Sequence, residues 1–247
     1  WQRYEGGKST IYACILTGKK TGECETSKIR ISGDEDSFHP SIEYAPRHNE
    51  IYDTFVVWET KTSIKACSLV ITSGVGCDTT LLVNKQGFTY PIFAGRTLLW
   101  KEKIDEENKI LKGCFLTSGS GELGTPHCNP IQIASGNIGP ETGDAWGSFV
   151  YAQKTDLGHI IFLNGRPINF NIPLLDHIAL SSSPQIFFKR VSAKPITYVV
   201  FKDINTLSGE ENTIWIVGIE ENDQGGIVRD IYRVLSPYHL STHGPSL

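Results

Sequence analysis

Short apolar runs separated by turn residues recur along the chain, and the stretch from Ser37 to Val83 shows them most clearly. Four such runs lie inside it, at residues 41–44, 54–58, 64–70 and 79–83. Strands of this length joined by short polar connections form antiparallel meanders. The pattern therefore predicts a four-stranded sheet over this stretch, and nowhere does it predict a helix longer than a turn or two.

Related copies of this stretch occupy the rest of the chain. Three copies share a tryptophan, a polar loop, a strand that carries a cysteine, and a second cysteine; their tryptophans are Trp1, Trp58 and Trp100. Two further copies lack the cysteines. A short strand opens each copy, and from Pro40 onward these openings recur at intervals of 37 to 61 residues. Four-stranded propeller blades of roughly 40 to 50 residues have such a period.

We therefore predict an all-β fold, a single-domain β-propeller of about five four-stranded blades, either complete or part of a larger propeller. No strand precedes Trp1 to match the strand that ends at Trp58. Gly244–Leu247 would supply only an opening strand, so we expect the second strand of the first blade to come from a longer chain or a partner, since open sheet edges invite pairing. The blade boundaries are expected near residues 33, 87, 136, 181 and 237.

The cysteines fall into local pairs where neighbouring antiparallel strands would face one another. Cross-strand disulfides are the expected outcome, and a zinc site is disfavoured because the chain contains no C-x-x-C spacing. Disulfides persist in oxidising compartments, which predicts a secreted or cell-surface protein, with the periplasm as an alternative. The expected pairs are Cys14 with Cys24, Cys67 with Cys77, and Cys114 with Cys128.

Composition and charge limit the classes of partner that we expect the protein to bind. The net charge is -4 and the pI is near 6.0, which disfavours a nucleic-acid surface because phosphate binding requires clustered Lys and Arg. No apolar run approaches the 18 or so residues that a membrane helix requires, so no membrane insertion is expected. The acidic residues 34–36 lack the spacing of a calcium loop. No cofactor or metal is predicted.

Two segments carry a family resemblance, His39-Pro40-Ser41-Ile42 and Val56-Val57-Trp58-Glu59. They resemble the first two strands of propeller repeats in bacterial sialidase-like and TolB-like proteins. The resemblance implies a propeller and raises glycoside hydrolysis, which needs two carboxylates converging on one bond. Among the expected inner strands only one offers an acid, Glu43, and the Asp-box motif of sialidases is absent. We therefore predict no catalytic residue.

The loops that enter the inner strands would lie on one face of a propeller. Aromatic rings in such loops offer flat apolar area with a polar edge, which suits sugars or extended peptides. We predict a non-enzymatic recognition or adhesion module, lectin-like, that binds a glycan or an extracellular protein; the alternatives are a glycoside hydrolase and a protein-binding scaffold. Trp58 and Trp100 are expected to pack between blades. The predicted ligand-binding residues are His39, Tyr90, Trp146, His243, Glu59 and Lys101.

Overall fold

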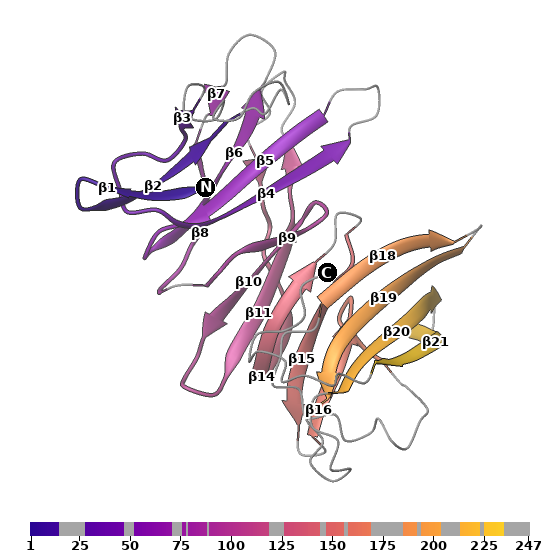
Figure 1. Cartoon of the computed structure of the whole chain (residues 1–247). Helices are drawn as coiled ribbons and strands as arrows, with labels where there is room; N and C mark the ends of the chain where they lie inside the picture. Colours follow the sequence, from indigo (N-terminus) through magenta and orange to yellow (C-terminus); the bar gives the residue numbers. More distant parts are fainter. Residues whose placement is uncertain are drawn as a thin grey trace. The chain divides into compact units, whose positions relative to one another are not determined.

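The structure is a computed structural model, and every regular element in the part of the chain that it describes is a β-strand (Figure 1). The all-β prediction is therefore confirmed. In those same ranges there is no helix with the length and apolarity needed to cross a bilayer. The described residues are 1–14, 28–46, 52–70, 76–77, 79–87, 89–118, 126–143, 147–155, 158–168, 185–191, 194–203, 213–222 and 225–234.

The chain divides into two compact units. The first comprises Trp1–Lys103 and Lys112–Ile131, and the second comprises Ile104–Leu111 and Gln132–Leu247.

Two antiparallel sheets, followed by three strands of a seven-stranded sheet, succeed one another along the chain from Trp1. The first sheet contains β1 (Gln2–Glu5), β2 (Lys8–Ala13) and β3 (Ile29–Arg30). The second sheet contains β4 (Phe38–Pro46), β5 (Tyr52–Glu59), β6 (Ser63–Val70), β7 (Gly76–Cys77) and β8 (Thr80–Asn84). The next strands are β9 (Ile92–Ala94), β10 (Thr97–Lys103) and β11 (Lys109–Phe115), which are neighbours at one end of a seven-stranded sheet and are called the third sheet. A separate pair joins β12 (Thr117–Ser118) to β13 (Pro126–His127).

The second sheet is buried on both faces. Successive side chains of a strand point to opposite sides, so neighbouring residues of β5 enter different clusters. On one face, Phe55 and Val57 of β5 pack in a cluster with side chains of the third sheet, including Trp100. On the other face, Val56 and Trp58 pack in a cluster with side chains of the first sheet. Trp58 and Trp100 are both 0% exposed, and each packs between neighbouring sheets. That these sheets are propeller blades stays a prediction.

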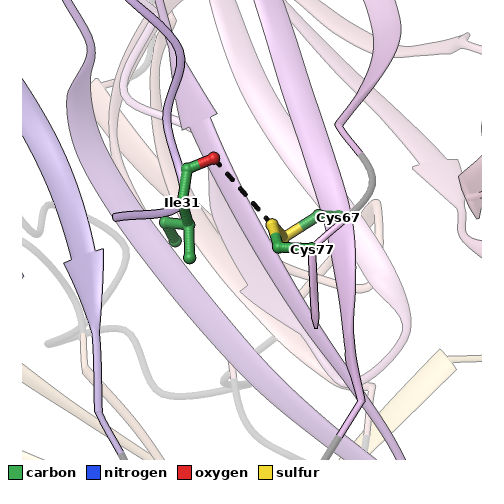
Figure 2. The surroundings of a disulfide bond; sticks show 3 residues. All are labelled: Ile31, Cys67 and Cys77. Carbon is green, nitrogen blue, oxygen red and sulfur yellow. Dashed lines mark hydrogen bonds between the residues drawn. A yellow bond between two sulfur atoms is a disulfide. The ribbon is translucent and has the colours of Figure 1, made fainter. Parts of the chain in front are cut away.

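Two of the predicted disulfides are present in the described residues, Cys67–Cys77 and Cys114–Cys128. Figure 2 shows that Cys77 lies against the first sheet, where its Sγ is 3.9 Å from the carbonyl oxygen of Ile31. A disulfide sulfur carries no proton, so we interpret this approach as a packing contact rather than a hydrogen bond. Cys14 is also disulfide-bonded, and its predicted partner Cys24 lies outside the described residues.

Two further groups of antiparallel strands make up most of the second unit. The first group, called the fourth sheet, is four neighbouring strands of a seven-stranded sheet: β14 (Ile131–Gly143), β15 (Phe149–Thr155), β16 (Gly158–Leu163) and β17 (Arg166–Pro167). The fifth contains β18 (Gln185–Val191), β19 (Lys194–Asp203), β20 (Thr213–Asn222) and β21 (Gly225–Val234), and Figure 1 shows it as one curved meander in orange to yellow.

Apolar side chains of the fourth and fifth sheets form one buried cluster. It includes Val150 of β15, Ile161 of β16, Val199 of β19 and Val217 of β20. The second unit is therefore packed like the first, in which successive meanders bury apolar side chains against each other. The sheets are open and antiparallel, and neither a closed barrel nor a propeller ring is seen in the described part of the chain. Their assembly into a propeller stays a prediction.

Candidate functional site

A buried carboxylate, Glu59 at the end of β5, is the centre of the candidate site. Its Oε2 accepts hydrogen bonds from Lys85 Nζ at 2.7 Å, from Thr89 N at 2.7 Å and from Thr89 Oγ1 at 3.0 Å. Its Oε1 contacts His39 Nδ1 at 2.6 Å and accepts from Tyr90 N at 3.0 Å. Because the side chain is 0% exposed, these contacts replace the water that the carboxylate loses on folding.

The environment of Glu59 favours its ionised form. Burial by itself would raise the pKa of this carboxyl, but the hydrogen bonds from Lys85, Thr89, His39 and Tyr90 outweigh burial and leave the pKa below its usual value. The carboxylate is therefore negatively charged at neutral pH, and every group bonded to it must donate.

Lys85 balances that charge from the connection that follows β8. Its ammonium group is 0% exposed and, besides Glu59, donates to the carbonyl oxygens of Thr60, at 2.8 Å, and Gly87. Buried ion pairs are tolerated when additional hydrogen bonds satisfy both partners, as they do here. The pair therefore joins the end of β5 to the segment that leads to Tyr90.

His39 and Tyr90 share an uncommon backbone conformation, with φ of 50° at each. Each residue precedes a proline, and non-glycine residues at positive φ cost about 1–3 kcal/mol. The hydrogen bonds to Glu59 offset that strain. The two rings lie with centroids 4.1 Å apart and planes inclined by 38°. Tyr90 is 57% exposed and the His39 side chain 33% exposed, so the ring pair reaches the surface.

The first sheet repeats this arrangement with a neutral residue. Gln2 follows Trp1 as Glu59 follows Trp58, and Gln2 Oε1 accepts a hydrogen bond from His39 N at 3.1 Å. In both cases the residue after the tryptophan binds the backbone N–H of the residue that precedes a proline in the following sheet. The sequence shows both partners, a residue after a tryptophan and a residue before a proline, but it does not show the hydrogen bond between them.

The third tryptophan is followed by Lys101, whose backbone N donates to the carbonyl oxygen of Thr89 at 3.3 Å. The backbone of Lys101 thus lies beside the segment that carries Tyr90. Nearby, Glu102 accepts from Trp100 Nε1 at 3.0 Å and from Lys112 Nζ at 2.8 Å. Burial opposes ionisation of Glu102, but the hydrogen bonds from Lys112 and Trp100 lower its pKa overall.

The structure brings three of the predicted site residues, His39, Tyr90 and Glu59, into direct contact. One role needs correction: a ligand cannot touch Glu59, because the side chain is fully buried, so Glu59 positions the other two. Trp146 and His243 lie outside the described residues. The role of Lys85 as the buried partner of Glu59 was not predicted. A lysine after an apolar run is usually exposed, and nothing in the sequence signals that this one is buried.

Metal binding has no support from side-chain geometry in the ranges described. No group of three or more His, Cys, Asp or Glu side chains is arranged there to hold an ion. The described site therefore offers hydrogen-bonding groups and aromatic surface to a ligand.

Comparison with protein-family models, with curated proteins and with solved structures finds no match. The resemblance to sialidase-like and TolB-like repeats therefore stays a prediction. Any function assigned to this protein rests on the residues of its own chain.

Proposed function

We propose that the protein is a non-enzymatic recognition module that binds carbohydrate through the His39–Tyr90 ring pair, on one face of a β-propeller. The observation that carries the proposal is the exposed Tyr90 ring, which is 57% exposed and lies against His39. Aromatic rings with one polar edge suit sugars, whose C–H groups pack on the ring while their hydroxyls meet polar neighbours.

Preorganisation supports a binding role for this pair. The backbone of Tyr90 is held by Glu59, and the backbone of His39 is held by Gln2. Residues kept in strained conformations by surrounding bonds occur at functional sites, where the strain fixes geometry. A ligand that meets a fixed ring pair loses less free energy to ordering than one that meets mobile loops.

The packing of the sheets supports the propeller part of the proposal. The second sheet is covered on one face by the sheet before it in the chain and on the other by the sheet after it. Blades of a propeller are stacked in this order. The disulfides favour an oxidising compartment, so we place the protein outside the cell, at the cell surface or in the periplasm.

Recognition is favoured over glycoside hydrolysis by the state of Glu59. Hydrolysis needs two carboxylates that reach the scissile bond, one of them as an acid with a raised pKa. Glu59 is buried, ion-paired with Lys85 and has a lowered pKa. It serves as a fixed anion that holds other groups in place.

A glycan array with the purified, oxidised protein tests the proposal. We expect retained binding to a defined set of sugars, with no loss of glycan during long incubation. Silence across the array at several pH values would overturn the proposed function, and progressive cleavage of a bound glycan would replace it with the hydrolase alternative.

A further inference from the structure

The hairpin formed by β1 and β2 carries an open sheet edge. β1 is the outermost strand of the first sheet, and Figure 1 shows the hairpin in indigo at the left of the view. Its two-residue turn has φ of 57° at Gly6 and 82° at Gly7, and positive φ at both positions is typical of a type I′ turn. Such a turn fixes the register of the two strands, in which Glu5 pairs with Lys8.

The hydrogen-bond pattern of β1 turns the backbone of Tyr4 toward the open edge. Trp1 N donates to Tyr12 O at 2.8 Å, and Tyr12 N donates to Trp1 O at 2.9 Å. Every second pair of an antiparallel ladder exchanges hydrogen bonds in this way, so Arg3 and Glu5 also bond toward β2, whereas Tyr4 faces outward. Within the described residues, neither the N–H nor the C=O of Tyr4 has a hydrogen-bond partner.

The repeat of the sheets leaves this part of the edge uncovered. Gln2 is the counterpart of Glu59, since each follows the tryptophan of its copy. In the second sheet, β4 pairs with β5 only as far as Glu59, which lies opposite Phe38. A strand equivalent to β4 would therefore reach Gln2 and leave residues 3–5 open. An open edge of this kind is a template for pairing with another chain.

We propose that residues 3–5 of β1 pair with the same residues of a second copy of this chain, antiparallel and about a two-fold axis at Tyr4. The two Tyr4 residues then exchange backbone hydrogen bonds across the edge. Arg3 lies opposite Glu5 of the second copy, and Glu5 lies opposite Arg3 of the second copy. Two-fold pairing places the same patch on both partners, so the contact closes as a dimer.

Charge complementarity selects this occupant and this register. Arg3 and Glu5 lie on one face of β1, with Nε and Oε1 2.8 Å apart and side chains 44% and 40% exposed. Tyr12 Oη also donates to Glu5 Oε2 at 2.6 Å, which holds the carboxylate on that face. A shift of the two-fold axis to Arg3 or to Glu5 would place like charges directly opposite, which destabilises a pair of strands. The Tyr4-centred register places opposite charges there instead.

Sedimentation equilibrium at low ionic strength, up to about 1 mM protein, tests the proposal. We expect a reversible equilibrium between monomer and dimer for the wild-type chain. Arg3→Glu and Glu5→Arg each create two like-charge pairs, so each should weaken self-association at least about tenfold. An equimolar mixture of these two variants restores both opposite-charge pairs and should form a heterodimer. Lys154→Glu makes the same change of net charge on exposed Lys154 of β15 and should leave the dimer unchanged.

Tyr4→Pro is the matched backbone variant, because it removes the outward N–H, and proline is accepted on an edge strand where that group faces solvent. We expect it to abolish the dimer while the melting temperature shows that the chain remains folded. A wild-type chain that stays monomeric at every concentration would overturn the proposal. A dimer that survives both charge reversals, or variants that do not associate when mixed, would also overturn it, because the contact would then lie elsewhere. Glycan binding is measured separately, so neither result depends on the other.

Discussion

The first and second sheets begin from similar sequence and reach different environments. Trp58 is 0% exposed and packs between these two sheets, whereas Trp1 is 41% exposed and stacks on Tyr12 with ring centroids 5.9 Å apart. The residue after each tryptophan nevertheless makes the same kind of bond, to the backbone N–H of His39 or of Tyr90. The hydrogen bond between successive sheets is therefore the same in both places. The burial of the tryptophan differs, because it depends on whether another sheet covers the ring.

A second difference concerns charge. Glu59 is an anion that accepts from four residues and is matched by Lys85, whereas Gln2 is a neutral amide in an exposed strand. A buried carboxylate is tolerated only where several hydrogen-bond donors compensate for the water that it loses. The second sheet supplies those donors, and this is where the ring pair is held.

Removing the two tryptophans should give the largest contrast. Trp58→Ala leaves a cavity between packed sheets and should lower the free energy of unfolding by about 3–5 kcal/mol. Trp1→Ala removes a partly exposed ring and should cost less than about 1 kcal/mol. Urea denaturation of both variants measures the difference, and equal losses would contradict the environments described for the two residues.

Neutralising the buried Glu59 carboxylate should give the next largest loss of stability. Glu59→Gln leaves Lys85 buried without its counter-ion, and we expect a loss of about 3 kcal/mol, at the low end for a broken buried pair because the amide oxygen still accepts. Urea denaturation reports this loss. The double variant Glu59→Gln/Lys85→Met removes the unpaired charge and should recover part of the stability. A double variant no more stable than Glu59→Gln alone would show that the unpaired Lys85 charge is not the cause of the loss.

The disulfide of the second sheet should contribute less. Cys67 and Cys77 are separated by 10 residues, and replacing both by Ala should cost about 2–3 kcal/mol through the unfolded chain, with a further loss from packing against the first sheet. Thermal unfolding of the double variant checks this. Labelling of these cysteines by a thiol reagent in the folded, unreduced protein would contradict the bond itself.

Acid should weaken the second sheet through Glu59. Its pKa is lowered by folding, so its contribution to stability is complete above the ordinary value of 4.5 and is lost as the pH falls through the folded-state pKa. The stability gap between wild type and Glu59→Gln should therefore shrink below about pH 4.5, by at most about 1.4 kcal/mol per pH unit. Urea unfolding from pH 7 to pH 3 measures the gap, and a constant gap would show that Glu59 does not titrate in this range.

Gln2→Ala should have the smallest effect. It removes one exposed hydrogen bond to His39 N, for which we expect about 0.5–1.5 kcal/mol. Urea denaturation reports the loss, and Gln2→Glu serves as the matched variant that keeps the acceptor. A loss of stability as large as that of Glu59→Gln would contradict the difference described between the Gln2 and Glu59 hydrogen bonds.

The sequence predicted the strands, the two observed disulfides and the interior position of Trp58 and Trp100, because these follow from alternation and spacing within single meanders. His39 and Tyr90 were predicted to point toward one rim because each lies in a loop that enters an expected inner strand, but their direct contact was not predicted. The burial of Glu59 and the part of Lys85 could not be predicted in the same way. Both depend on contacts between the end of β5 and the segment after β8, which no local pattern encodes.

The most direct test of the ring pair compares two exposed tyrosines of the first unit. Tyr90 is 57% exposed beside His39, and Tyr4 is 74% exposed on β1. For a glycan identified on the array, calorimetric titration should show at least about tenfold weaker binding by Tyr90→Ala, with little change in melting temperature, and unchanged binding by Tyr4→Ala. Equal affinity in the two variants, or a fall in the melting temperature of Tyr90→Ala that matches its loss of binding, would contradict the account.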